Sequence, residues 1–499
     1  MAGGMKRLAK ETAIYGVSSI VGRFLNWLLV PMYTRVFTGT DEFGIFTNLY
    51  AIVALLLVIL TYGMETGFFR FINKKEEQEP TRVYATTLCS VGTTSLLFIL
   101  AVFLFLSPLS NALGYSQHPE FIAMMLSVAA ADAFLSIPFA YLRYQSKATR
   151  FAFIKLFNIF LNIGLNIFFL LACPWIYVKA PQLIDWFYQA GYGVGYVFVA
   201  NVCTVIATFL LLLPDMFPAF KSKPDFSLLK QILRYSFPIL ILGIAGILNQ
   251  TADKIIFPFL FEDETYAKEQ LGIYGACFRM AAVMVMFIQA FRYAYEPFIF
   301  AKNKEDDGNT KAYVEAMKYF IIFALLIFVG VMFYIDILKY FVTPAYYPGL
   351  RVVPIVMLGE LFFGIYFNLS LWYKLIDQTK WGAYFSIIGC VTTVCIIVLF
   401  APHYGYMACA WASFISNLLM MLISYFIGQK KFPIRYDLKS AFTYFVLAIV
   451  LYTAGMLPEI EPLWIKLLYR TVLLLFFVGF IVRKDLPLAE LPFIGKYFK

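Results

Sequence analysis

Charged residues are scarce in this chain: they make up 14% of its 499 residues, whereas hydrophobic residues make up 62%. A soluble domain carries about 25% charged residues, so the composition argues against a soluble protein and indicates a polytopic membrane protein. Histidine occurs only twice, at His118 and His403. Two histidines this far apart in the sequence do not form a recognisable metal-binding pattern. We expect no metal site.

Catalytic motifs are missing as well. The sequence contains no P-loop, HExxH or GxSxG pattern, so neither ATP hydrolysis nor hydrolase chemistry has a candidate site. The connections between apolar runs are short, the longest predicted outer one being 174–189. A membrane enzyme that acts on sugars would expose carboxylates on a larger loop. We therefore predict a transporter without a cofactor, not an enzyme.

Cysteines are few and show no pairing pattern. The seven cysteines lie in or at the ends of apolar runs, and an odd count argues against a disulfide framework. Negative charge is also in deficit, which leaves a net charge of +10. The basic residues flank apolar runs and form no single patch, so they indicate contact with anionic lipid headgroups and not with nucleic acid.

What the chain has in abundance is apolar runs of about 20 residues, the length that crosses a bilayer. They predict an all-α polytopic membrane protein with about fourteen transmembrane helices. The predicted spans are 12–37, 43–68, 83–107, 119–142, 150–173, 191–213, 234–260, 270–299, 312–337, 351–376, 381–400, 406–428, 438–456 and 463–482.

Lysine and arginine alternate strongly between the two sides of these spans. With the N-terminus inside, most of them fall in cytoplasmic segments, as the positive-inside rule requires. Both termini are therefore predicted to be cytoplasmic. The first span carries Arg23 and has no small-residue cleavage site, so we expect it to remain in the mature protein.

The chain repeats itself weakly. The segment that begins at Tyr15 is echoed from Tyr235, and the one around Gly44 is echoed around Gly272, an offset of 228 residues. Six spans separate the copies, so both have the same orientation, and transporters commonly bind substrate between such halves. The predicted organisation is two parallel six-helix lobes with two extra C-terminal helices. The predicted parts are an N-terminal lobe 1–213, a cytoplasmic linker 214–233, a C-terminal lobe 234–430, and helices 13 and 14 with the tail in 431–499.

Polar residues interrupt the seventh span in the stretch "NQTADKIIFPF", residues 249–259. A charge at the bilayer centre costs ~3 kcal/mol or more, so such residues usually face a protein interior or a watery cavity. Asn249 and Gln250 lie four residues before Asp253 and Lys254. The latter two point ~100° apart on a helix, so we expect that they do not simply neutralise each other along it.

Other predicted spans carry polar residues at helical spacing. We expect four cations within the spans, in a graded track that an anion could follow: Arg292 toward the cytoplasm, Arg23 and Arg279 near the middle, and Lys254 toward the outside. Polar neighbours and candidate carriers of a coupling ion are Asn26, Glu65, Asp132, Asn249, Gln250, Asp253, Gln289 and Glu296. Asn158, Asn162 and Asn166 form a ladder in the fifth span, and Glu360 lies in the tenth.

A structural interpretation stands beside the functional one. The cations have potential carboxylate partners: Arg23 with Glu65 or Asp132, Lys254 with Asp253, and Arg292 with Glu296. Ion pairs of this kind can simply hold helices together. The asparagine ladder is explained equally well by hydrogen bonds between helices and by contact with a substrate.

Two stretches resemble a known family. "YYPGLRVVPIVMLGELFFGIYFNLSLWYKLIDQTKWGAY" (346–384) and "HYGYMACAWASFISNLLMMLISY" (403–425) resemble the polysaccharide biosynthesis and O-antigen flippase family of the multidrug/oligosaccharidyl-lipid/polysaccharide exporter superfamily. The opening "YGVSSIVGRFLNWLLVPMYTRVFT" is similar to the usual start of that family.

The resemblance implies transport of an undecaprenyl-diphosphate-linked oligosaccharide from the cytoplasmic to the outer leaflet of the bacterial inner membrane. It also implies that the two six-helix lobes surround a central cleft lined by basic residues, which here match Arg23, Lys254, Arg279 and Arg292. Because the sequence has no nucleotide site, we expect transport to draw on a gradient of H⁺ or Na⁺ or on removal of the product. Expected partners are the lipid-linked oligosaccharide, membrane lipids and other polysaccharide-assembly membrane proteins. The alternatives are a cation-coupled multidrug exporter of the same fold, a membrane-embedded polysaccharide polymerase and a purely structural scaffold.

Overall fold

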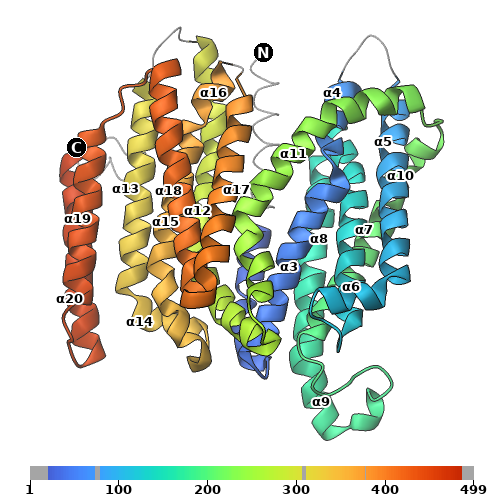
Figure 1. Ribbon diagram of the computed structural model, residues 1–499, viewed down its shortest axis with the longest axis horizontal. Helices are drawn as coiled ribbons and strands as arrows, with labels where there is room; N and C mark the ends of the chain where they lie inside the picture. Colours follow the sequence, from blue (N-terminus) through green and yellow to red (C-terminus); the bar gives the residue numbers. More distant parts are fainter. Residues whose placement is uncertain (1–20, 74–78, 306–310, 377, 486–499) are drawn as a thin grey trace. The chain divides into compact units, whose positions relative to one another are not determined.

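The computed structural model describes residues 21–485 apart from 74–78, 306–310 and 377; at 294 and 296–305 it describes the backbone alone. The described residues are almost entirely helical and include no β-strand (Figure 1). This confirms the predicted all-α class.

Thirteen helical segments in the described part of the chain are long and apolar enough to cross a membrane. Each overlaps one of the predicted spans, including the short segment predicted at 438–456. The first predicted span, 12–37, lies partly outside the described residues, although residues 21–27 and α2 (Val30–Val36) are helical. The helices of the thirteen segments are α3 (Thr40–Thr61) with α4 (Met64–Ile72), α5 (Pro80–Leu104), α7 (Pro119–Tyr144), α8 (Ala148–Ile167) with α9 (Cys173–Lys179), α10 (Gly195–Phe220), α11 (Phe226–Ile256), α12 (Glu264–Glu305), α13 (Lys311–Phe333), α15 (Val352–Leu369) with α16 (Leu371–Leu375), α17 (Lys380–Tyr404), α18 (Tyr406–Lys431), α19 (Leu438–Met456) and α20 (Leu463–Lys484).

The second predicted span is broken into α3 and α4. Tyr62 and Gly63 have φ angles of 34° and 71°, in the left-handed region that ends an α-helix. A Cβ atom at Gly63 would lie 2.9 Å from the backbone oxygen of Ser236, so glycine also permits the close approach of α11. The break starts a new helix directly before Glu65.

The chain divides into two compact units. Unit 1 contains Met1–Ala276 and Gly382–Ser413, and unit 2 contains Cys277–Trp381 and Phe414–Lys499. We describe each unit by itself. The predicted lobe boundaries near 213 and 430 remain predictions.

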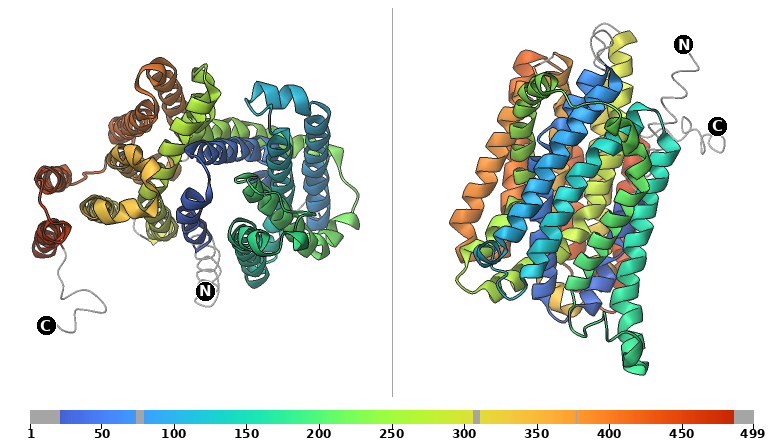
Figure 2. Two further views of the ribbon diagram at one scale, coloured as in Figure 1. Left: turned by 90° about the horizontal axis from the view of Figure 1, so that it is seen from below. Right: turned by 90° about the vertical axis from the view of Figure 1, so that its right-hand side faces the viewer.

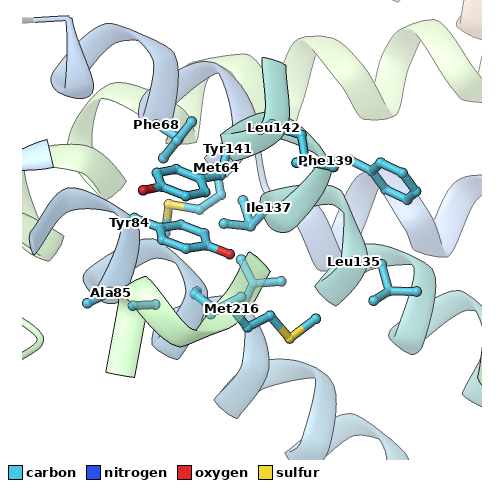
Figure 3. Close-up of a cluster of buried hydrophobic side chains, with 14 of the residues drawn as sticks. Met64, Phe68, Tyr84, Ala85, Leu135, Ile137, Phe139, Tyr141, Leu142 and Met216 are labelled. Carbon is cyan, nitrogen blue, oxygen red and sulfur yellow. The ribbon is translucent and has the colours of Figure 1, made fainter. Parts of the chain in front are cut away.

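The core of unit 1 is built around α7, which packs against α3, α5 and α10. Its main cluster contains Met64, Phe68, Tyr84, Tyr141 and Met216, all buried (Figure 3). The rings of Tyr84 and Tyr141 stack with centroids 4.0 Å apart, and the Tyr84 hydroxyl donates a 3.0 Å hydrogen bond to the backbone oxygen of Asp215. These contacts fix α5, α7 and α10 relative to one another.

A symmetric contact joins the N-terminal ends of α3 and α12. A Cβ at Gly44 would lie 1.9 Å from the backbone oxygen of Lys268, and one at Gly272 would lie 1.7 Å from that of Thr40. The four residues are related in pairs by the same 228-residue offset as the sequence repeat. Equivalent positions therefore contact each other as in a two-fold interface, and only glycine allows the backbones to come this close.

Unit 2 holds the last two spans. Helices α19 and α20 run side by side (Figure 2, left) and pack against α13. Arg470 of α20 is fully buried and donates hydrogen bonds to the backbone oxygens of Gly455 (2.9 Å) and Phe333 (3.1 Å). Its guanidinium also pairs with Asp336 at 2.8 Å, next to α14 (Ile335–Leu338), where Lys466 binds the same carboxylate. One buried cation thus ties α20 to α19 and α13.

Candidate functional site

Asp253 and Lys254 form an ion pair near the end of α11. The Lys254 Nζ lies 2.8 Å from Asp253 Oδ2 and 3.0 Å from Oδ1, and it also donates to the backbone oxygen of Gln250 at 3.3 Å. The expectation that these adjacent residues do not neutralise each other was wrong. Their Cβ atoms do diverge, but the long lysine stem carries its ammonium back across the helix to the carboxylate.

Long-range contacts hold this pair. The Tyr274 hydroxyl donates a 2.6 Å hydrogen bond to Asp253 Oδ2. The buried Asn48 donates to the backbone oxygen of Lys254 at 2.7 Å and accepts a 2.8 Å bond from the Tyr115 hydroxyl. The Asp253 side chain is 5% exposed and that of Lys254 13%. An anion that reaches Lys254 must therefore compete with a carboxylate that is fixed in place.

A second group of charged side chains in unit 1 involves α4, α7 and α8. Glu65 pairs with Arg143 at the end of α7. Lys155 of α8 interacts electrostatically with Asp132, Arg143 and Glu65, and its ammonium lies 4.0 Å from the centroid of the Phe139 ring. The suggested partnership of Arg23 with Glu65 is therefore wrong: the break at Tyr62–Gly63 places Glu65 against Arg143.

Asp132 stands apart from these pairs. Within the described part of the chain it makes no ion pair, and the charge that acts on it is that of Lys155, at longer range.

Arg23 and Asn26 are exposed on the helix 21–27, and Gln250 is exposed on α11. Asn249 accepts a 3.1 Å hydrogen bond from Thr393 of α17.

The asparagine ladder of α8 bonds to neighbouring helices. Asn158 donates to Thr208 at 2.8 Å and Asn162 to Asn201 at 3.0 Å. The buried Asn166 accepts a 3.1 Å bond from the Tyr33 hydroxyl and donates to Asn162. These contacts favour the structural interpretation, in which the ladder joins α8 to α10 and α2.

In unit 2, two cations share one aromatic ring. The guanidinium carbon of Arg292 lies 4.2 Å from the centroid of Phe367, and the Lys374 ammonium lies 4.7 Å from it. Arg279, Gln289 and Glu360 are partly buried, the first two on α12 and the third on α15. The side chain of Glu296 lies outside the described residues, so its suggested pairing with Arg292 stays a prediction.

The sequence analysis missed several charged residues within the span helices. Besides the four expected cations, Arg143, Lys155, Lys374 and Arg470 lie in helices α7, α8, α16 and α20. All four lie within eight residues of the end of a predicted span, where a lysine or arginine normally reaches the interface. A single sequence does not show which carboxylate or aromatic ring of another helix lies beside each of these cations.

The four predicted cleft cations divide between the units: Arg23 and Lys254 belong to unit 1, and Arg279 and Arg292 to unit 2. The predicted graded track remains a prediction. Among the described residues, no group of three or more His, Cys, Asp or Glu side chains is placed to hold a metal ion. What the helices do present is positive charge within membrane spans, balanced locally by carboxylates or aromatic rings.

Thirteen described helical segments of this length and composition define the class of multi-pass membrane proteins. The family described as "Polysaccharide biosynthesis protein" matches residues 8–301, more than half of the chain, and the chain belongs to that family. A search of curated protein sequences found no match.

Several solved structures share the fold. A structure of the lipid II flippase MurJ in an inward closed conformation is 15% identical, with a TM-score of 0.71, and the match covers 94% of this chain and 98% of that one. An inward-facing MATE-family multidrug transporter of the MOP superfamily is 14% identical, with a TM-score of 0.62, over 82% and 94%. The MATE multidrug transporter DinF-BH, solved as a complex, is 15% identical, with a TM-score of 0.59, over 88% and 96%. The protein therefore has the fold that these membrane transporters share.

Proposed function

We propose that this protein flips undecaprenyl-diphosphate-linked oligosaccharide units, of the O-antigen or capsule type, from the cytoplasmic to the outer leaflet of the bacterial inner membrane. Membership of the polysaccharide biosynthesis family supports the class of cargo. The fold shared with the lipid II flippase supports an alternating-access cycle.

The observation that carries the proposal is the cluster of Arg292, Phe367 and Lys374. Two positive charges lie 4.2 Å and 4.7 Å from the same ring centroid, in helices of apolar spans. Two cations that share one ring repel each other, and an anion that binds beside them lowers this repulsion. A diphosphate carries the required charge, and the arginine fork fits its oxygens. The lipid tail of such a cargo can remain in the bilayer.

Energy for the cycle would come from an ion gradient, since the sequence contains no nucleotide-binding motif. One elementary charge moved across 100 mV supplies ~2.3 kcal/mol. The candidate carriers are Glu65, Asp132, Asp253 and Glu296. Asp132 is the strongest of them, because Glu65 is paired with Arg143 and Asp253 with Lys254 and Tyr274.

The test is flipping of a fluorescent polyprenyl-diphosphate oligosaccharide in proteoliposomes that contain the purified protein. We expect transfer between leaflets with the wild-type protein and losses of about tenfold or more with Arg23→Ala, Arg279→Ala and Arg292→Ala, because each removes a cation from a predicted cleft position. Full activity in all three variants at normal expression would reduce these residues to structural roles.

The same vesicles distinguish the rival function. The MATE-like fold also fits a multidrug exporter, which would move cationic drugs. We expect no transport of a cationic dye, because Arg292 and Lys374 repel it. Dye transport without lipid flipping would replace the proposal with the exporter. In cells, loss of the protein should cause lipid-linked oligosaccharide to accumulate on the cytoplasmic side.

A further inference from the structure

Helix α11 begins with a segment suited to a membrane interface. Asp225 caps its N-terminus by accepting hydrogen bonds from the backbone nitrogens of Ser227 (2.8 Å) and Leu228 (3.2 Å). In the following turns Phe226 and Phe237 are 84% and 61% exposed, whereas Leu228 and Ile232 are buried in the core of unit 1. Exposed aromatic rings beside exposed cations are typical of the lipid headgroup region.

The helix bends as it enters the apolar part of unit 1 (Figure 1). Pro238 lies inside it and removes a backbone hydrogen-bond donor, which accounts for the bend. Beyond Pro238, α11 packs with one face on α3, where a Cβ at Gly243 would lie 2.8 Å from Val58. Another face is turned to α17.

Between α11 and α17 lies an open apolar groove of about 230 Å³. Its lining contains only hydrophobic side chains, four from α11 and three from α17: Ile241, Ile244, Ala245, Leu248, Ile387, Cys390 and Val391. Ile241, Ile387 and Val391 are each between 42% and 55% exposed. All seven belong to unit 1. Because the groove opens on the surface of a membrane helix pair, hydrocarbon chains have access to it.

The groove lies on the same face of α11 as two exposed cations near the start of that helix. Lys230, Arg234, Phe237 and Ile241 occur at i, i+4, i+7 and i+11, so they share one face of the helix. Lys230 and Arg234 are exposed. Ile241 lies seven positions after Arg234 along the helix, a rise of about 10 Å. The sequence places the cationic end on the cytoplasmic side.

We propose that this face of unit 1 binds the prenyl diphosphate part of the lipid-linked cargo: Lys230 and Arg234 hold the diphosphate, and the α11–α17 groove holds the first part of the tail. This rests on the proposed function and adds a lipid site outside the predicted cleft. Two cations one helical turn apart match the two phosphates of a diphosphate.

The groove favours a single branched chain over a phospholipid. A water molecule takes ~30 Å³ of liquid and a methylene group is of similar size, so the groove admits on the order of eight carbon groups, which is one or two isoprene units of one chain. A phospholipid would leave its second chain outside. The lining side chains Ile241, Ile387 and Val391 are β-branched and form an uneven wall, which suits a methyl-branched chain.

The test is photo-crosslinking of the purified protein in phosphatidylcholine nanodiscs with farnesyl diphosphate that carries a diazirine in its tail. We expect labelled peptides from 241–248 and 387–391. Excess unlabelled farnesyl diphosphate should compete, and phosphatidylglycerol should not. Val391→Trp should fill the groove and Lys230→Gln with Arg234→Gln should remove the charge, and each change should lower this labelling by about tenfold, which corresponds to ~1.4 kcal/mol.

Val450→Trp is the matched control, because Val450 is as exposed on α19 (54%) as Val391 is on α17 (55%). Equal loss of labelling in Val450→Trp, labelling spread over other helices, or equal competition by phosphatidylglycerol would each overturn the site. Flipping is measured in the same preparation. Flipping without groove labelling overturns this inference and leaves the proposed function intact, whereas groove labelling in a protein that flips nothing overturns the proposed function and leaves the prenyl site.

Discussion

Lys254 shows how a single side chain can serve two interactions. Its ammonium is held by Asp253, yet 13% of the side chain stays exposed, while the carboxylate is also fixed by Tyr274. We infer that Lys254 is the outermost cation that the diphosphate meets, and that Asp253 orients it. The loop after α11 contains Glu262 and Asp263, and Glu264 begins α12; all three are exposed, and their charge would help to release the anion.

Substitutions at this pair should separate charge from geometry. Lys254→Arg should keep substantial flipping, Lys254→Gln should lose about tenfold and Lys254→Glu more, because charge matters most there. Asp253→Asn should alter ion dependence or thermal stability instead. Flipping rates and melting temperatures of the four purified variants provide the measurement. Normal flipping by Lys254→Glu with abolished flipping by Asp253→Asn would reverse the two roles.

At the scale of the element, the close crossing of α3 and α12 depends on the absence of side chains. A methyl group at Gly44 or Gly272 would overlap a backbone oxygen, which cannot move aside as a flexible side chain can. Each helix supplies the glycine that the other one requires. The contact is therefore a shared constraint on both copies of the repeat.

Gly44→Ala and Gly272→Ala should each destabilise the protein by ~1–3 kcal/mol, the usual cost of overpacking. Gly164→Ala is the control: Gly164 lies inside α8 and nothing lies within 4 Å of the position its Cβ would take. Alanine favours a helix over glycine, so this control should be neutral or slightly stabilising. Thermal unfolding in detergent measures all three. If Gly44→Ala behaves as Gly164→Ala does, the helices separate at this point without cost.

The ion pairs between Asp336 and the two α20 residues Lys466 and Arg470 should respond to acid. Burial alone would raise the pKa of Asp336, but its pairing with Lys466 and Arg470 outweighs burial and lowers it below the usual ~3.9. A lowered carboxyl pKa stabilises the folded state above the ordinary value, and this stability is lost as the pH falls through the lower, folded-state value. We therefore expect α20 to loosen only below about pH 4.

Asp336→Asn should remove this acid response and cost ~3 kcal/mol at neutral pH, because it leaves the buried Arg470 without its carboxylate. Glu459→Gln, an exposed change between α19 and α20, should stay within about 0.5 kcal/mol of the wild type. Thermal unfolding between about pH 3 and pH 7 tests both. Equal stability of the two variants would show that the backbone bonds of Arg470 suffice to hold α20.

For the molecule as a whole, the proposed cycle couples a lipid cargo to an ion. Asp132 is a membrane-helix carboxylate that makes no ion pair with the described residues, and Lys155 is the charge that acts on it. A carboxylate in that position can gain and lose a proton, or bind a sodium ion, without first breaking a salt bridge.

Flipping in proteoliposomes should therefore rise when an inward proton or sodium gradient is imposed. Asp132→Asn should abolish this stimulation while leaving downhill flipping within about threefold of the wild type, because the variant keeps the fold and loses only the charge. Asp185→Asn, an exposed change in the connection after α9, is the control. Transport that ignores both gradients, or a wild-type response in Asp132→Asn, would remove Asp132 from the coupling role.

The chain by itself determined the helical class and the position of every described span, because a run of about 20 apolar residues can satisfy its backbone within a bilayer only as a helix. It also contained the repeat, whose offset reappears in the Gly44–Gly272 contact. These properties are local, or are periodic along one chain.

Partnerships between side chains were decided by the tertiary structure alone. Glu65 meets Arg143, 78 residues away, because α3 breaks at Tyr62 and α7 packs beside α4. Lys254 reaches Asp253 because a lysine stem is long enough to cross the helix surface. The α11–α17 groove needs residues that lie more than 130 positions apart in the sequence. The hydropathy of a residue indicates how strongly its side chain prefers lipid to water. Its contact partner depends on which helix packs next to it, and the packing of the whole unit sets that arrangement.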